Sequence, residues 1–186
     1  MVSSQPALSP AQRFVIIGST GSGKTTLANQ LAVALALPHI ELDALHWGPN
    51  WTSAPVGGFR QKVRSALTDS CWVIDGNYSE VRDITWGQAT DLVWLDYSLL
   101  LIWSRLFRRA FQRVFHQEEL WSGNKESWRG QFLSRDSLFL YAYTSRKKHH
   151  KVYPAVLSQP DYAHLHVHRF RAPHQTESWL QGLKGG

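Results

Sequence analysis

The chain has 186 residues, of which 43% are hydrophobic and 18% charged, and this size and composition predict one globular domain. Its formal charge is +6, and its single cysteine, Cys71, excludes an intrachain disulfide and a four-cysteine zinc site. No apolar run reaches the length of about 18 residues that a membrane span needs, so we expect a soluble cytoplasmic protein without a membrane partner.

The positive charge is concentrated in the second half of the chain. Residues 1–98 carry six basic and eight acidic side chains, whereas residues 99–186 carry fourteen basic and six acidic ones. The segment 105–151 alone has a net charge of +7. A local positive field of this kind predicts a polyanionic ligand, either a nucleotide or a nucleic acid.

Strand and helix patterns alternate along the chain. We expect residues 1–12 to form a loose tail and residues 13–186 to form the domain. The expected strands are 13–17, 39–43, 71–75, 91–97 and 163–170, and the expected helices are 25–37, 56–67, 99–115, 131–151 and 176–183. Residues 116–130 are polar and contain glycine, which indicates a loop or flap. This alternation predicts a parallel sheet with right-handed crossovers.

A phosphate-binding loop is predicted between the first strand and the first helix. Residues 18–25 match the pattern G-x-x-x-x-G-K-[ST], although a Gly/Ser-rich turn without a ligand is the alternative. The glycines allow successive backbone N–H groups to point at a phosphate, and the helix dipole adds positive charge. Lys24 would bridge the β- and γ-phosphates of ATP, and the Thr25 hydroxyl would ligate Mg²⁺. The candidate nucleotide-binding residues are Gly18, Ser19, Thr20, Gly21, Ser22, Gly23, Lys24, Thr25 and Thr26.

A magnesium site beside this loop needs a carboxylate at the end of a neighbouring strand. Asp75 ends the segment Trp-Val-Ile-Asp-Gly, where the glycine permits a sharp turn over the phosphates. Asp96 precedes a helix start and can instead be an N-terminal charge or cap. We therefore predict that Asp75 and Thr25 form the protein part of the magnesium site, with Asp75 as a catalytic residue.

The phosphoryl acceptor is expected at the end of the second strand, where Asp43 would accept the proton of an acceptor hydroxyl. A helix cap is the alternative for Asp43. Trp47 and Trp51 can stack on a base or sugar, or pack against the following helix. His39 is expected to be an ordinary strand residue. Further candidates, each with an ordinary packing or solvent-exposed alternative, are His46, Arg60, Arg64 and Arg82.

The expected helix over 99–115 carries three arginines at a spacing of four, Arg105, Arg109 and Arg113, which places them on one face. Such a stripe suits a polyphosphate, and a closing lid would bring it to the transferred γ-phosphoryl group. We expect Arg105 and Arg109 to bind nucleotide, Arg109 and Arg113 to act in catalysis, and residues 105–151 to form the lid. The same face can instead contact nucleic-acid phosphates.

Two other clusters have ordinary alternatives. Residues 146–151 are most simply a solvated helix end, although Arg146 can reach the nucleotide. His164, His166 and His168 alternate along one strand and resemble a metal site, but we expect no metal there because the strand has no carboxylate partner.

These motifs together resemble the nucleoside monophosphate kinase-like branch of P-loop proteins, and within it the small adenylate kinase-like and topology modulation ATPases. The resemblance is carried by residues 18–25, 42–51, 72–78, 93–96, 105–113 and 120–124. It implies an α/β, three-layer P-loop fold in which helices flank a five-stranded parallel sheet, with a short helical lid, and ATP and Mg²⁺ as ligands.

The chain also departs from adenylate kinases. They carry Asp-Gly-Phe-Pro-Arg where this chain has Asp-Gly-Asn-Tyr-Ser at 75–79, so the arginine that grips an acceptor phosphate is missing unless Arg82 replaces it. Asp43 with His46 is closer to shikimate and gluconate kinases. We expect a kinase, a monomer or weak dimer, acting on a hydroxylated metabolite or a nucleotide. The alternative is an ATP-binding, nucleic-acid-associated protein that uses the basic 105–151 surface.

Overall fold

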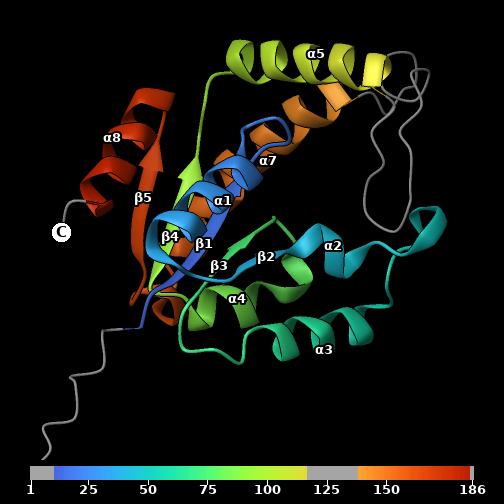
Figure 1. Cartoon of the computed structure of the whole chain (residues 1–186). Helices are drawn as coiled ribbons and strands as arrows, with labels where there is room; N and C mark the ends of the chain where they lie inside the picture. Colours follow the sequence, from blue (N-terminus) through green and yellow to red (C-terminus); the bar gives the residue numbers. More distant parts are fainter. Residues whose placement is uncertain (1–10, 117–137, 185–186) are drawn as a thin grey trace, which may run out of the picture.

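Five parallel strands form one sheet in the order β2-β3-β1-β4-β5 (Figure 1). The computed structural model describes residues 11–116 and 138–184, with side chains described for 11–109 and 140–184. The strands are β1 (Arg13–Gly18), β2 (His39–Glu41), β3 (Trp72–Asp75), β4 (Asp91–Leu95) and β5 (His166–Phe170). The predicted five-stranded parallel sheet is confirmed.

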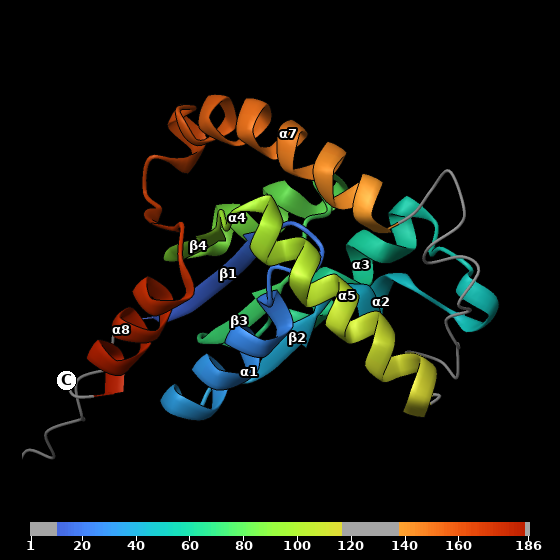
Figure 2. The same cartoon turned by 90° about the horizontal axis from the view of Figure 1, so that it is seen from above.

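Helices cover both faces of this sheet. They are α1 (Lys24–Leu35), α2 (Leu42–His46), α3 (Val56–Ala66), α4 (Arg82–Gln88), α5 (Leu99–His116), α7 (Leu138–Leu157) and α8 (Pro173–Lys184), with 3-10 turns η1 (Pro49–Trp51), η2 (Ser79–Val81) and η4 (Pro160–Tyr162). Seen from above, α5 runs between α1 and α7 (Figure 2). None of the helices in the described residues combines the length and apolar character needed to cross a membrane.

The central strand β1 is buried on both sides, as its unbroken apolar run predicts. Because side chains alternate along a strand, Val15 and Ile17 point into one core with α3, α4 and α7, whereas Phe14 and Ile16 point into the other with α1, α5 and α8. The three-layer arrangement thus follows from this alternation, and it holds the loop after β1 at the carboxyl edge of the sheet.

Several elements differ from the sequence-based expectation: β5 and α8 each begin three residues away from the expected position, and the largest differences concern β2, α4 and α7. The second strand ends at Glu41 rather than at residue 43, because the chain turns at once into α2, and this places Asp43 in the first turn of that helix. Helix α4 was not predicted, since Thr85 and Gly87 are poor helix formers; burial of Ile84 and Trp86 in the core stabilises it.

Helix α7 extends to Leu157 and contains Pro154, whereas we expected a helix over 131–151. A proline inside a helix removes a backbone hydrogen bond and favours an end or a kink. Here the neighbouring Tyr153 is 2% exposed and packs edge-on against Trp86 and Trp94, with ring centroids 5.6 and 5.4 Å apart. Tertiary packing therefore overrides the local signal.

Helix α7 also buries a histidine of the segment 146–151, for which the sequence predicts a solvated helix end. His149 is 8% exposed, and its ring stacks on that of Tyr153 at a centroid distance of 4.5 Å. Its Nδ1 is buried with no hydrogen-bond partner among the described residues. Burial, together with the charge of Lys24, lowers the pKa of His149 from 6.5 to about 4.

This burial predicts a pH-dependent stability. Between pH 4 and 6.5 the unfolded chain binds a proton at His149 that the native state does not bind, so the free energy of unfolding falls as the pH falls through this window. We expect the wild type to lose on the order of 3 kcal/mol more than a His149→Phe variant across it, at about 1.4 kcal/mol per pKa unit. Urea unfolding of both proteins measures this difference. The exposed His174→Phe is the control, and parallel curves for wild type and His149→Phe would contradict the prediction.

Candidate active site

The loop after β1 is shaped for close contact with α5. Gly21 and Gly23 have φ values of 77° and 92°, in the left-handed region that favours glycine. A Cβ atom on Gly21 would lie 2.7 Å from Cγ of Leu106, so a larger residue would push α5 away from the loop. At the neighbouring position, Arg105 Nη1 donates a 2.6 Å hydrogen bond to the Ser22 carbonyl oxygen. The loop and α5 thus form one wall.

Two polar groups of the loop fit a bound phosphate. Lys24 Nζ lies 3.4 Å from the Ser19 carbonyl oxygen, and burial lowers the pKa of Lys24 against the opposing effects of Asp75 and Asp43. The hydroxyl oxygen of Ser22 is buried and has no partner among the described residues. Both observations fit an anion in the loop, because an anion would compensate the ammonium charge and satisfy the hydroxyl.

The carboxylate of Asp75 closes the loop on the β3 side. Asp75 is 5% exposed, and the Thr25 hydroxyl donates a 2.7 Å hydrogen bond to its Oδ2. No group of three or more His, Cys, Asp or Glu side chains that could hold a metal occurs in the described part of the chain. A hydroxyl and a carboxylate nevertheless fit Mg²⁺, which binds oxygen and completes its shell with water and phosphate.

Asp96, the second carboxylate considered for magnesium, is paired with cationic side chains and does not cap α5, whose first turn is bonded by Ser98. Arg169 donates to its Oδ2 from Nε and Nη2 at 3.0 and 2.7 Å, and Arg146 and His150 contact its Oδ1. Arg146 also donates to the Tyr97 carbonyl oxygen at 3.0 Å, so in this structure it is bound to the fold rather than directed at a nucleotide. Asp96 thereby joins β4, β5 and α7.

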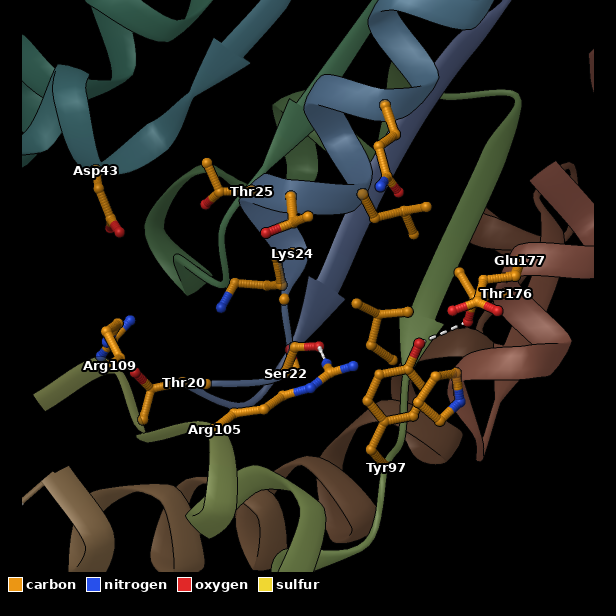
Figure 3. Close-up of a pocket in the computed structure, with 17 residues that line it drawn as sticks. Thr20, Ser22, Lys24, Thr25, Asp43, Tyr97, Arg105, Arg109, Thr176 and Glu177 are labelled. Carbon is orange, nitrogen blue, oxygen red and sulfur yellow. Dashed lines mark hydrogen bonds between the residues drawn. The ribbon is translucent and has the colours of Figure 1, made fainter. Parts of the chain in front are cut away.

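A cavity of about 600 Å³ runs along the loop (Figure 3). The predicted residues that line it are Thr20, Gly21, Ser22, Gly23, Lys24, Thr25, Thr26, Asp43, Arg105 and Arg109. Its far end is lined by Tyr97, Pro173, Thr176 and Glu177, which we had not predicted. Gly18 and Ser19 are not among the lining residues, and Gly18 is instead hydrogen-bonded to the Asn77 side chain through its N–H and carbonyl groups. The side chain of Arg113 and residues 117–137 of the expected lid lie outside the described residues.

Asp43 lies at the opposite end of the cavity from Glu177 (Figure 3). The Tyr78 hydroxyl donates a 2.6 Å hydrogen bond to Asp43 Oδ1. Burial and the charge of Asp43 raise the pKa of Tyr78, so the phenol keeps its proton and remains the donor. Tyr78 thus holds one oxygen of a carboxylate that faces the same cavity as Lys24.

The remaining acceptor-side candidates contact other protein groups. The His46 ring packs at centroid distances of 4.7, 4.9 and 4.6 Å from Trp47, Phe59 and Tyr78, and the rings of Trp47 and Trp51 are 5.8 Å apart. Arg60 forms two hydrogen bonds with Asp83, at 2.8 and 2.6 Å, and a third with the Glu80 carbonyl oxygen. Arg82 lies over the Trp86 ring at 4.9 Å, and Arg64 is exposed on α3.

Two histidines have carboxylate partners that sequence reasoning missed, and for His168 this corrects the expectation of a strand without such a partner. The ring of His39, expected to be an ordinary strand residue, lies 3.0 Å from Asp75 Oδ1 through Nε2. His168 does have a carboxylate partner, because its Nε2 lies 2.8 Å from Asp91 Oδ1 on the adjacent strand. Hydrophobic periodicity could not have predicted either contact, since each joins residues from different strands. The roles of Asn77 and Tyr78 could have been predicted, because both belong to the motif Asp-Gly-Asn-Tyr.

No protein-family model matches the chain, and no curated protein matches it significantly. The solved structures similar to it include shikimate kinase from Acinetobacter baumannii in complex with shikimate, with a TM-score of 0.56, 14% identity, and coverage of 92% of this chain and 90% of that one. A gluconokinase from Sinorhizobium meliloti 1021 has a TM-score of 0.53, 18% identity, and coverage of 94% and 92%. At these identities the likeness shows the fold, and it confirms the predicted α/β P-loop fold. The narrower resemblance to adenylate kinase-like and topology modulation ATPases stays a prediction.

Proposed function

We propose that this protein is an ATP- and Mg²⁺-dependent kinase that transfers the γ-phosphoryl group of ATP to a hydroxyl group of a small acceptor. One observation carries the proposal: a single cavity is lined both by the phosphate-binding loop, from Thr20 to Thr26, and by Asp43. A phosphoryl donor and a proton-accepting carboxylate would therefore share one cavity, as direct transfer requires.

The candidate residues have distinct roles in this proposal. Lys24, the loop N–H groups, Arg105 and Arg109 would bind the phosphates, and Arg109 with Arg113 would stabilise the negative charge of the transferred group. Thr25 and Asp75 would hold Mg²⁺, which when bound neutralises charge on the phosphate oxygens. Residues 105–151 would include the lid that excludes water from this site.

The transfer step places the proton on Asp43. The acceptor oxygen forms a bond to the γ-phosphorus, the bond between the γ-phosphorus and the β–γ bridging oxygen breaks, and ADP leaves with that electron pair. The acceptor proton passes to the Asp43 carboxylate, whose other role, as acceptor from Tyr78, keeps it aimed at the cavity. No covalent enzyme intermediate is needed.

The acceptor is proposed to be a hydroxylated metabolite or a nucleotide. The solved structures of similar fold include kinases whose names specify shikimate and gluconate as substrates, which supports the hydroxylated metabolite. The test is ADP release with a panel of nucleosides, nucleoside monophosphates and hydroxylated metabolites, with shikimate and gluconate among them. We expect one class to raise ADP release above the rate with ATP alone. Background rates with every acceptor would contradict the kinase proposal.

A second function, nucleic-acid binding, is supported by four exposed cations of the basic segment, Arg108, Lys147, Lys148 and Lys151. Electrostatic binding to duplex DNA should weaken roughly tenfold or more from low to physiological salt. Fluorescence anisotropy of a labelled duplex at two salt concentrations tests this, and absence of binding at low salt would exclude it. The kinase is favoured because Arg105 and Arg109 from the same segment line the cavity.

A further inference from the structure

His39 occupies an unexpected position beside the proposed magnesium site. It begins β2, an edge strand of the sheet, yet its side chain is only 11% exposed. The ring turns inward and fills the space between α1 and the end of β3, where its two nitrogen atoms face different partners. A half-buried polar ring with a partner at each nitrogen has a preferred orientation.

The two partners belong to the two walls of the site. Nδ1 lies 2.9 Å from Asn29 Oδ1 on α1, and Nε2 lies 3.0 Å from Asp75 Oδ1 on β3. Since a carboxylate oxygen only accepts, Nε2–H donates to Asp75. In this tautomer Nδ1 accepts, so the Asn29 side chain meets it with its amide N–H₂ group, the oxygen and nitrogen of the amide being exchanged. Asn29 stands one helical turn after Thr25, on the same face of α1. The hydrogen bonds of Thr25, Asp75, His39 and Asn29 therefore form a closed ring through α1.

Both oxygens of the Asp75 carboxylate are thus held from opposite sides. Thr25 donates to Oδ2 at 2.7 Å, and His39 donates to Oδ1 at 3.0 Å. Asp75 is 5% exposed, so loss of either donor would leave an oxygen of a buried carboxylate unsatisfied. Without His39 only the Thr25 hydroxyl would hold the carboxylate, and Oδ1 would lose the contact that fixes its direction.

We propose that His39 is a positioning residue, which holds the Asp75 carboxylate in the orientation that the magnesium site requires. The inference rests on the proposed function, because it concerns the metal that accompanies ATP. Residues that are hydrogen-bonded to a metal-ligating carboxylate orient this carboxylate and affect the affinity of the site for the metal. Their replacement typically weakens metal binding by about 10- to 100-fold. His39 does not touch the nucleotide cavity itself, since it is not among the residues that line it.

The experiment measures binding of a fluorescent ATP analogue to the full chain, in EDTA and over a titration of Mg²⁺. His39→Phe keeps a ring of similar size but removes both hydrogen bonds, whereas His39→Gln retains an N–H donor. The matched control is His168→Phe, which breaks another His–Asp pair of the sheet, with Asp91 at the start of β4. Thermal unfolding establishes that each variant is folded.

We expect His39→Phe to raise the Mg²⁺ concentration for half-maximal binding about tenfold or more, while affinity in EDTA stays within about twofold of wild type. His39→Gln should recover most of the loss, and His168→Phe should behave as wild type. Should His39→Phe not fold, Asn29→Ala, which frees the ring on the other side, is expected to raise the same Mg²⁺ concentration to a smaller extent.

Three results would overturn the proposal: unchanged Mg²⁺ dependence in His39→Phe, an equal loss of affinity in EDTA, or a His39→Gln variant as defective as His39→Phe. In each of these cases the kinase proposal is unaffected, provided that the wild type binds the ATP analogue in a Mg²⁺-dependent way. If the wild type binds no analogue under either condition, the proposed function fails and the role of His39 falls with it.

Discussion

Replacement of Lys24 by alanine is expected to reduce ATP turnover by roughly 10²- to 10³-fold and to weaken ATP binding, as loss of one preorganised charge at a transferred group typically does. Lys24 is the first residue of α1 and lines the cavity where the loop meets this helix. Burial lowers the pKa of Lys24, so its ammonium group lacks a full counter-charge until an anion binds. Phosphate oxygens would supply that charge. Steady-state ADP release and equilibrium binding of a fluorescent ATP analogue measure the two effects.

Lys62→Ala is the matched control for this variant. Lys62 is exposed on α3, and its Nζ lies 3.4 Å from the Leu45 carbonyl oxygen, outside the cavity. It should bind and turn over ATP as the wild type does. If Lys24→Ala retains wild-type affinity and rate while its unfolding temperature is unchanged, the loop does not hold phosphate as proposed.

Asp43→Asn is expected to lower phosphoryl transfer by about 10²- to 10⁴-fold, the usual contribution of a positioned general base, with ATP affinity unchanged. The amide keeps the size of the carboxylate and can still accept the Tyr78 hydrogen bond, but it cannot take the acceptor proton. The transfer rate with the best acceptor of the panel and the dissociation constant for the ATP analogue separate the two quantities.

The control here is Asp161→Asn, an exposed carboxylate in η4 on the connection between α7 and β5. It should leave both transfer and binding unchanged. Transfer by Asp43→Asn at the wild-type rate would remove Asp43 from the proposed mechanism. A loss of ATP binding in the same variant would instead assign Asp43 to the nucleotide side of the cavity.

The sequence predicted the elements whose signals are local. β1, the glycine loop and α1 follow one another within residues 13–35, where the apolar run, the motif and the helix pattern are each readable from neighbouring residues. The end of the second strand was harder to predict from the sequence, because residues 39–43 favour strand and helix alike. The structure begins α2 at Leu42, which is 2% exposed and lies so close to Gly76 that a Cβ there would be 2.7 Å from Leu42 Cβ.

The contacts of buried polar residues could not be predicted. The partners of Asp96 are separated from it by 50, 54 and 73 positions along the chain, and His39 is 36 positions from Asp75. Such pairs depend on the order of strands in the sheet, which hydrophobic periodicity does not determine. The positive charge of the second half of the chain was therefore only partly assigned from the sequence. Arg105 and Arg109 line the cavity as predicted, whereas Arg146 compensates the charge of the buried Asp96 carboxylate.

The contact between α5 and the loop affects the entropy of ligand binding. Arg105 is held by the Ser22 carbonyl oxygen and by the face of the Tyr97 ring, 5.1 Å from its guanidinium carbon. A free arginine side chain loses on the order of 2 kcal/mol of rotamer entropy when it is immobilised. For Arg105 this loss occurs during folding rather than during association, so a phosphate that reaches the loop meets a guanidinium group already in place.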